Sequence, residues 1–568
     1  MFNLEIIQLS STYLQSSQMA VLRLGFVLTA VLFTTSLTNS EQDLPCRARN
    51  LGIEGRSIVC VCDANYCDTI TREDPSRGTY VVYTSSDSGK RFEKSFGQIQ
   101  TVALNDPEST KADKEPTPKE MLEESDFDGQ ENTTIWNSVR LRLFTNTRYQ
   151  TIEGFGGSVT DAAAINWRKL SDAAQTQFIN TYFGPKGLEY NMIRVPIAGA
   201  DFSTHPYTYN ELPWNDGALT NYSLSDEDLF LKLPMIRRSL HAANHEVKIT
   251  ASCWSPPIWM KTNERITGFG QVKREFYQSY ADYHLRFIEE YAKANVKIWA
   301  ITTTNEPING IVPAAPFNSL GWMPSQMATW IANNLGPTIR NSPFNDTLIL
   351  AVDDQRYLLH FYVIGMERAE PKAFDYIDGI AIHYYGNFAP AQLLTNIQNR
   401  YPDKILLSTE ACEGAMPWDA MRVEIGSWRR ARNYITSILQ DLNNFVVGWI
   451  DWNLCLSPTG GPNWADNFVD SPILVYAEDD EFIKNPMFYA MGHFSKFIPR
   501  GSVRILASRR SIMTIENLAV LTPQGNMVVV LHNRNNRDMN VRLDIGTTRY
   551  IQLVLEPHSV KTIEINHN

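Results

Sequence analysis

At 568 residues the chain is too long for a single small core, and its 43% hydrophobic and 11% aromatic residues suit a large globular protein of two or three domains. The formal net charge of -11 argues against nucleic acid as a partner, because phosphate binding requires clustered Lys and Arg. An acidic surface is typical of proteins from acidic compartments, although many cytosolic proteins share this charge balance.

The first forty residues have the pattern of a cleaved secretion signal. Met19 and Arg23 precede an apolar run at 24–33, and small polar residues follow it. The run is shorter than the roughly 20 apolar residues that span a bilayer, which disfavours a membrane anchor. We therefore expect residues 1–40 to be removed, with translation starting at Met1 or at Met19. Export would permit glycosylation at three Asn-x-Ser/Thr triplets: Asn132, Asn221 and Asn345.

Four cysteines crowd a stretch that is too short to bury a core of its own: Cys46, Cys60, Cys62 and Cys67. Two disulfides are the expected staple, and three pairings are possible. A zinc site is the alternative, but C-x-C spacing without a nearby His makes a poor tetrahedral cage. The other cysteines are dispersed, and we expect free thiols at Cys253, Cys412 and Cys455.

Short alternating runs toward both ends of the chain predict an antiparallel β-sandwich. Polar and apolar residues alternate in TYVVYTSS and SVRLRLFTN near the beginning, and in NMVVVLHNR and VRLDIGTTRYIQLVL near the end. Residues 105–131 interrupt the first part. They are acidic and contain few large apolar residues, so burial cannot offset their ordering entropy, and we expect a mobile surface loop.

The middle of the chain predicts a parallel (β/α)8 TIM barrel. Eight apolar runs follow one another, with stretches long enough for a helix between them, such as 276–295. A doubly wound open sheet is the alternative, but runs that each end in polar or aromatic residues favour closure. The runs are TIEGFGG, YNMIRVP, VKITASCW, VKIWAITTTNEP, LILAVDD, YIDGIAIHYY, KILLSTEA and FVVGWIDWN.

The strand ends of such a barrel converge on one cavity, where reactive groups are expected. Here they supply carboxylates, an amide and indoles. This set suits a sugar, because pyranoses offer hydroxyls and apolar faces. The residues are Arg194, Asp201, Trp254, Asn305, Glu306, Asp353, Asp354, His383, Tyr385, Glu410, Asp451 and Trp452.

Two of these carboxylates predict glycoside hydrolysis. Glu306 ends the fourth run within Asn-Glu-Pro, and Glu410 ends the seventh run. A single Glu at a strand end is more often an ion-paired structural residue, but two on one rim beside Asn305 favour catalysis. A retaining enzyme needs one protonated and one ionised carboxyl roughly 5 Å apart, whereas about 9 Å would predict inversion. This chemistry requires no metal and no organic cofactor.

Longer motifs carry a resemblance to a known family. They run from about Cys46 to the end of the chain, interrupted mainly by 105–131: VCVCDANYCD, GFGGSVTDAAA, IRVPIAGADFS, NEP, DDQR, STEAC, VVGWIDWNL, GGPNWADNFVDSPI and MFYAMGHFSKFIPRGS. In these stretches the chain resembles the lysosomal glucosylceramidase (acid β-glucosidase) family, part of glycoside hydrolase family 30.

The resemblance implies three structural parts. They are a small disulfide-bearing sheet from 41–70 with about 454–485, a β-sandwich from 71–145 with about 502–568, and a barrel from 146–453 with about 486–501. It also implies disulfides that pair Cys46 with Cys60 and Cys62 with Cys67.

By motif match, the resemblance implies that Glu306 is the general acid/base and Glu410 the nucleophile of a retaining β-glucosidase that cleaves glucosylceramide. Five residues match positions that hold glucose: Asp201, Trp254, Asn305, Trp452 and Asn467. Three others would surround the carboxylates: Arg194, His383 and Tyr385. The alternatives are another β-glycosidase or a transglucosylase, acting on a xyloside or a steryl glucoside, and a catalytically silent binding protein.

The family also implies lysosomal partners: an anionic lipid surface, a saposin-type activator and a sorting receptor. We expect surface apolar groups near the pocket at Ile266, Phe269, Phe468 and Val469. The chain departs from the family at the pocket entrance, with Ala315-Pro316-Phe317 for Tyr-Pro-Phe, Tyr384 for Trp, and a different sequence around Phe388. These departures concern lipid and activator contacts more than hydrolysis.

Overall fold

The computed structural model describes residues 42–102, 137–312, 316–510 and 515–567. Three predictions lie outside these residues and stay predictions: the signal 1–40, the loop 105–131 and the glycan acceptor Asn132. Residues Asp43–Asn568 form one compact unit. None of the helices within the described ranges combines the length and the apolar character that a bilayer crossing requires.

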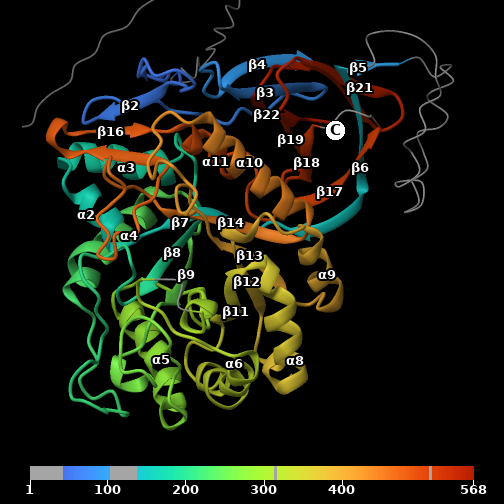
Figure 1. Ribbon diagram of the computed structural model, residues 1–568. Helices are drawn as coiled ribbons and strands as arrows, with labels where there is room; N and C mark the ends of the chain where they lie inside the picture. Colours follow the sequence, from blue (N-terminus) through green and yellow to red (C-terminus); the bar gives the residue numbers. More distant parts are fainter. Residues whose placement is uncertain (1–41, 103–136, 313–315, 511–514, 568) are drawn as a thin grey trace, which may run out of the picture. The chain divides into compact units, whose positions relative to one another are not determined.

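The middle of the chain forms the predicted closed barrel of parallel strands (Figure 1). Each apolar run gives one strand, and the strands pair in chain order until the last returns to the first. The (β/α)8 prediction is therefore confirmed, and the open-sheet alternative is wrong. The strands are β7 (Gly154–Ser158), β8 (Met192–Ile197), β9 (Lys248–Cys253), β10 (Ala300–Thr302), β11 (Leu348–Gln355), β12 (Gly379–His383), β13 (Ile405–Glu410) and β14 (Val446–Asn453).

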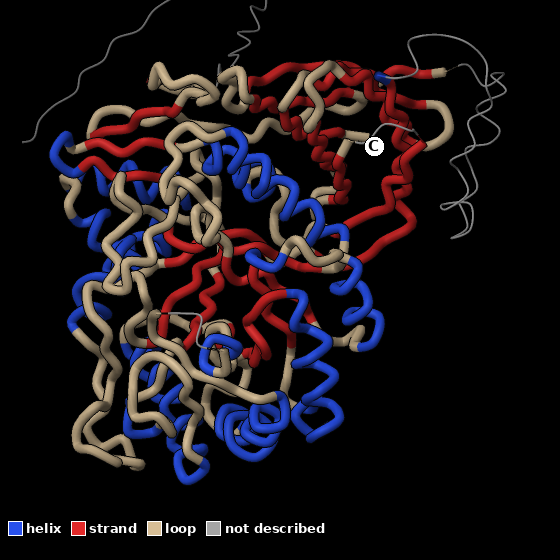
Figure 2. Tube along the Cα trace, in the orientation of Figure 1, coloured by secondary structure: helices blue, strands red, loops and turns tan. Residues whose placement is uncertain are grey.

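Helices connect the barrel strands, as the tube in Figure 2 shows. Polar side chains begin several of them: the hydroxyls of Thr160, Ser171 and Ser427 accept backbone N–H groups of the first turn. The connecting helices are α2 (Asp161–Arg168), α3 (Asp172–Phe183), α4 (Leu233–Ala242), α5 (Tyr277–Lys293), α6 (Pro324–Trp330), α7 (Gly336–Arg340), α8 (Gly365–Ala369), α9 (Gln392–Arg400) and α10 (Trp428–Asn443). A further helix, α11 (Pro486–Ser495), follows the last barrel strand.

The glycines of the first strand allow a close approach to the second. A Cβ atom on Gly156 would lie 1.8 Å from the carbonyl oxygen of Met192. In the same ladder Ser158 pairs with Arg194. A side chain at Gly156 would displace the strand that carries this arginine.

Strand β11 ends in a bulge that orients two acidic side chains. The register shifts between Val352 and Asp354, and both Val352 (φ 78°) and Asp353 (φ 55°) have left-handed backbone. Such a bulge changes the direction of the side chains beside it. The side chains of Asp353 and Asp354 are consequently both buried.

A four-stranded sheet forms beside the cysteine-rich stretch, in the order β1-β2-β16-β15. The strands are β1 (Ala48–Arg49), β2 (Val59–Asp63), β15 (Ile473–Tyr476) and β16 (Glu481–Lys484). Disulfides join Cys46 to Cys60 and Cys62 to Cys67, the pairing that the resemblance implied. The zinc alternative is therefore wrong. The remaining cysteines are buried free thiols, as predicted: Cys253, Cys412 and Cys455.

Both ends of the chain contribute to a ten-stranded sheet, in the order β4-β3-β22-β19-β18-β17-β6-β20-β21-β5. Its pairs are antiparallel except β6 with β20. These two strands come from opposite ends of the chain, so no hairpin fixes their relative direction. The strands are β3 (Thr79–Ser86), β4 (Glu93–Gln98), β5 (Gln100–Thr101), β6 (Ser138–Thr151), β17 (Val503–Arg510), β18 (Glu516–Leu521), β19 (Met527–Asn533), β20 (Met539–Ile545), β21 (Arg549–Leu555) and β22 (Ser559–Ile565).

Helices α10 and α11 connect this sheet with the barrel. The hydroxyl of Thr436 in α10 donates to Glu516 of β18 at 2.8 Å, and His493 in α11 bonds Thr562 of β22 at 2.8 Å. Both helices also contact barrel strands. The sheet nevertheless has an apolar core of its own, which includes Leu531 and Leu543.

Candidate active site

The carboxyl ends of the barrel strands open into a cavity of about 490 Å³. The volume lies within the range of small-molecule sites. Most of the predicted site residues line it: Asp201, Trp254, Asn305, Glu306, Tyr385, Glu410, Trp452 and Asn467. The other two, Arg194 and His383, are buried behind the carboxylates and bond to them. The structure thus brings all ten side chains together.

Glu306 follows β10 in a left-handed conformation with φ 41°, immediately before the 3₁₀ turn Pro307–Gly310. Its carboxylate accepts hydrogen bonds on both oxygens. Oε1 accepts from Gln355 Nε2 at 2.8 Å and is 3.1 Å from His383 Nδ1. Oε2 accepts from Asn309 Nδ2 at 2.6 Å. The carboxylate is therefore oriented from three directions before any substrate binds.

Glu410 ends β13 and faces Glu306 across the cavity. Its Oε2 accepts from the guanidinium of Arg194, and its Oε1 accepts from the hydroxyl of Tyr385 at 2.9 Å. An oxygen of Glu410 lies within 4.8 Å of an oxygen of Glu306. One sugar carbon can therefore come within reach of both carboxyl groups.

Arg194 is a buried cation whose hydrogen bonds are well satisfied. Besides Glu410, its Nη2 donates to Asp353 Oδ2 at 3.0 Å and to Asn305 Oδ1 at 2.8 Å, and its Nε donates to Ser252 at 3.2 Å. These partners offset the cost of burying the charge. Because the oxygen of the Asn305 amide is engaged in this way, its NH₂ group is the end that can donate to a ligand.

The charges behind the carboxylates stabilise one another. Burial by itself lowers the pKa of His383, but the carboxylates of Glu410 and Asp353 outweigh it and raise that pKa to about 10. Burial raises the pKa of Asp353, but Arg194 and His383 outweigh it and hold that pKa well below its usual range. Burial also raises the pKa of Glu410, and the same two cations oppose the rise. His383 is therefore an imidazolium between carboxylates at physiological pH.

One wall of the cavity is polar and another is aromatic. Asp201 Oδ2 accepts from Asn467 at 3.0 Å and from Asn463 at 3.2 Å, and burial raises the pKa of Asp201 to about 7. Trp254 and Trp452 stack with ring centroids 5.2 Å apart and an interplanar angle of 20°. Both indoles are largely buried yet line the cavity, so core packing alone does not account for their place.

Sequence reasoning missed two amides that bond to Glu306. Gln355 belongs to the DDQR motif, which supported the resemblance but was given no role. Asn309 lies three residues after Glu306, a spacing at which a tight turn returns a side chain to its starting residue. The three-residue spacing could have predicted the role of Asn309. For Gln355, the available signal was its position directly after two acidic residues at a strand end.

Exposed aromatic side chains surround the mouth of the cavity. Phe388 and Trp418 are 77% and 73% exposed, and both line the opening. Tyr357 stacks on Phe388 with ring centroids 5.5 Å apart and an interplanar angle of 26°. Together Tyr357, Phe388 and Trp418 form an aromatic rim around the cavity mouth.

The surface apolar groups predicted near the pocket have different outcomes. Phe269 is exposed, and Ile266 and Phe468 are half-buried. The prediction for Val469 is wrong, because this side chain is only 1% exposed. It packs in an apolar cluster with Trp452 and forms part of the cavity wall.

The departures from the family pattern lie at the cavity mouth. Pro316 and Phe317 line the opening, and Ala315 lies outside the described residues. The hydroxyl of Tyr384 donates to Glu413, which also accepts from Asn433 at 3.0 Å. Because Glu413 begins the segment that leads to Trp418, Tyr384 helps to anchor one side of the aromatic rim.

Among the residues that the structure describes, two groups of side chains have the proximity of metal ligands, but neither suits a resident cation. Glu306, His383 and Glu410 place ligand atoms within 4.8 Å of one another. His383 is itself cationic there, and Arg194 already neutralises Glu410. In the second group, with Asp68, both cysteines are consumed by their disulfide.

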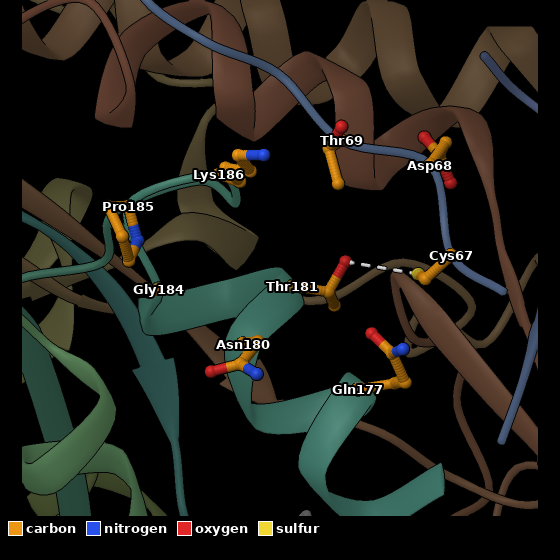
Figure 3. A pocket seen from close by; sticks show the side chains of 9 residues that line it. All are labelled: Cys67, Asp68, Thr69, Gln177, Asn180, Thr181, Gly184, Pro185 and Lys186. Atoms are coloured by element: carbon orange, nitrogen blue, oxygen red, sulfur yellow. Dashed lines mark hydrogen bonds between the residues drawn. The ribbon is translucent and has the colours of Figure 1, made fainter. Parts of the chain in front are cut away.

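A second cavity, of about 260 Å³, lies between helix α3 and the segment that follows the Cys62–Cys67 disulfide (Figure 3). Thr181 of the helix points toward Cys67, with its oxygen 3.5 Å from the sulfur. The acidic side chain of this cavity, Asp68, is engaged by Lys484 and Tyr489. This cavity therefore lacks the paired carboxyls of the barrel site.

Comparisons with known proteins agree with this geometry. Residues 152–498 match the glycosyl hydrolase family 30 TIM-barrel domain, and residues 501–563 match the glycosyl hydrolase family 30 beta sandwich domain. The chain is 38% identical over 525 residues to lysosomal acid glucosylceramidase of Mus musculus, covering 91% of this chain and 95% of that protein. It is 25% identical over 439 residues to an endo-1,6-beta-D-glucanase of Trichoderma harzianum, covering 74% of this chain and 84% of that protein.

Solved structures show the same architecture. SrfJ from Salmonella typhimurium superposes with a TM-score of 0.74 at 25% identity, covering 86% of this chain and all of that one. An endo-beta1,6-glucanase superposes with a TM-score of 0.71 at 23% identity, covering 85% of this chain and 99% of that one, which shows the fold alone. From the family matches and the identity to the mouse protein, this chain belongs to glycosyl hydrolase family 30 and is a glycoside hydrolase.

Proposed function

We propose that this chain is a retaining β-glucosidase that hydrolyses glucosylceramide to glucose and ceramide, with Glu306 as general acid/base and Glu410 as nucleophile. The observation that carries the proposal is that one oxygen of Glu306 and one oxygen of Glu410 lie within 4.8 Å of each other. Retaining enzymes hold their carboxyls about 5 Å apart, whereas inverting enzymes need about 6.5–9.5 Å to admit a water molecule.

The surroundings of the two carboxyls suit these roles. Arg194 and Tyr385 both donate to Glu410 and orient it for attack, and the cations Arg194 and His383 oppose the rise in pKa that burial causes there. Glu306 faces the cavity between two amides and His383, in position to exchange a proton with a ligand.

The cycle has two steps. Glu410 attacks the anomeric carbon while Glu306 gives its proton to the glycosidic oxygen, which takes the electron pair of the breaking bond. A covalent glucosyl-enzyme results. Glu306 then accepts a proton from water as the water attacks the same carbon, Glu410 leaves, and glucose is released with its β configuration retained.

The polar and aromatic walls would hold the glucose. Asp201 and Asn467 present hydrogen-bonding groups to its hydroxyls, and Trp254 and Trp452 present apolar faces to its ring. The NH₂ group of Asn305 would donate to the sugar 2-hydroxyl, a contact that strengthens as positive charge develops on the ring.

The aromatic rim and the mouse relative favour a lipid aglycone. An exposed apolar opening suits the hydrocarbon of ceramide. The mouse relative, which matches along most of the chain, is named a lysosomal acid glucosylceramidase. We extend its substrate and its lysosomal location to this chain as part of the proposal.

The same reasoning applies to the partners. An anionic lipid surface, a saposin-type activator and a sorting receptor belong to this proposal, as does entry through the secretory pathway. The exposed positions of Asn221 and Asn345 support glycosylation on that route. The disulfides suit an oxidising compartment.

Covalent trapping tests the nucleophile. An epoxide that mimics glucose should label Glu410, as read by peptide mass spectrometry, and Glu410→Gln should be neither labelled nor active. Glu54→Gln, at an exposed position, is the matched control and should behave like wild type. Labelling of Glu306 in place of Glu410 would reverse the two roles.

Product and substrate assays test the remaining parts. Proton NMR of the first-formed glucose should show the β anomer, and an α anomer would establish inversion. Hydrolysis of glucosylceramide at acidic pH should exceed that of nitrophenyl β-xyloside. The opposite order, or glucose transferred to an added alcohol in place of water, would favour the xylosidase or transglucosylase alternative.

A further inference from the structure

The turn after Glu306 returns an amide to its carboxylate. Asn309 is the third residue of the 3₁₀ turn Pro307–Gly310, and its backbone N–H donates to the carbonyl oxygen of Glu306 at 2.9 Å. Its side-chain Nδ2 lies 2.6 Å from Glu306 Oε2. Asn309 is half-buried and lines the cavity, so it is close to where a glycosidic oxygen would lie.

The two oxygens of Glu306 have unequal surroundings. Oε1 is bonded by both Gln355 and His383, whereas Asn309 is the one donor to Oε2 among the described residues. His383 also bonds Asp353 through its Nε2 at 3.0 Å. Because the imidazolium keeps both of its N–H groups, its Nδ1–H continues to point at Oε1. The proton of the acid form therefore belongs on Oε2.

The NH₂ group of an amide can donate to that oxygen in either state, because a protonated carboxyl oxygen still has a lone pair that accepts a hydrogen bond. Within the described part of the chain, the side-chain amide of Asn309 makes no other hydrogen bond, so no second contact competes for its NH₂ group. From this geometry we propose that Asn309 is a positioning residue for the acid/base carboxyl. Its NH₂ group donates to Oε2 both when that oxygen is ionised and when it carries the proton, and in the second state the proton is left to point toward the glycosidic oxygen.

This inference rests on the proposed function, and it deepens the role of Glu306. Before bond cleavage, Asn309 directs the Oε2 proton toward the leaving oxygen. After the glucosyl-enzyme forms, the same amide holds the ionised oxygen where the attacking water gives up its proton. Loss of Asn309 should therefore impair those steps in which Glu306 transfers a proton.

Leaving groups of different basicity test the proposal. For Asn309→Ala, kcat/KM on an alkyl β-glucoside should fall about tenfold, since its departure needs the proton. On 2,4-dinitrophenyl β-glucoside, kcat/KM should change by less than about twofold, because that leaving group departs unassisted. On this dinitrophenyl substrate, kcat of Asn309→Ala should fall, because release of the glucosyl group to water still needs the base. Added azide should restore kcat, because azide is a nucleophile that needs no base. Asn309→Asp, which cannot donate from its carboxylate, should lose more than Asn309→Ala on the alkyl substrate.

Asn399→Ala, at an exposed position of helix α9, is the control and should match wild type throughout. Equal losses on both substrates, or a loss confined to KM, would overturn the proposal by showing a structural or substrate-binding role. Asn309→Ala with wild-type rates on the alkyl substrate would also overturn it, while leaving the proposed function intact. A wild-type protein that cleaves neither glucoside would remove the proposed function, and this inference with it.

Discussion

The buried carboxyl of Asp451 should make stability depend on pH, and Asp451→Asn should remove its share. Asp451 lies in β14, and its Oδ1 accepts the hydroxyl of Tyr434 at 2.7 Å and the N–H of Trp452 at 2.9 Å. Burial raises its pKa to about 8 despite these bonds. Asparagine has nearly the same shape and keeps an oxygen for both donors, but it does not ionise.

The direction of this pH dependence follows from the pKa of Asp451 in the unfolded and in the native chain. In the unfolded chain an aspartate loses its proton near pH 4, whereas native Asp451 keeps it up to about pH 8. Between those values the native state binds the proton more tightly, so each unit of rising pH lowers the free energy of unfolding by about 1.4 kcal/mol. From about pH 5 to about pH 7.5, Asp451 alone lowers the free energy of unfolding by about 3 kcal/mol.

Urea unfolding followed by tryptophan fluorescence at both pH values gives the measurement. Between about pH 5 and about pH 7.5, the free energy of unfolding of wild type should fall by about 3 kcal/mol more than that of Asp451→Asn. Asp375→Asn, at an exposed position, should keep the wild-type pH dependence. If wild type and Asp451→Asn lose the same free energy within about 1 kcal/mol, the reasoning from burial is refuted.

Three further predictions follow from the same structure. Burial also raises the pKa values of four other acids: Asp161, Asp201, Asp354 and Asp441. The melting temperature of wild type should therefore fall between about pH 5 and about pH 8 in scanning calorimetry, and a rise would contradict these pKa shifts. Arg194→Met leaves Glu410 and Asp353 without their cation, and should cost about 3–5 kcal/mol of stability and nearly all turnover; a stable, active variant would show that the pair is dispensable. Trp418→Ala should raise KM several-fold for glucosylceramide in vesicles and leave nitrophenyl β-glucoside kinetics unchanged, whereas equal effects on both substrates would place Trp418 at the glucose instead.

The sequence by itself was sufficient to predict the barrel and the two carboxyl groups. Near-continuous apolar runs separated by helical periodicity have few folded solutions, and a parallel barrel buries every run. Once the runs are strands, the residue that ends each one must lie at the cavity. Glu306 and Glu410 could therefore be placed opposite one another without coordinates, although their separation could not be measured.

Only the tertiary structure decided the contacts that give those residues their properties. Arg194 and Glu410 are 216 residues apart, and no local pattern encodes the bond between them. The parallel pairing of β6 with β20, the burial of Val469 and the bulge at Asp353 likewise depend on packing between distant segments. Periodicity reports which face of a segment is buried. Charge pairing and pKa values depend on which groups from distant segments are buried next to one another, and only folding brings those groups together.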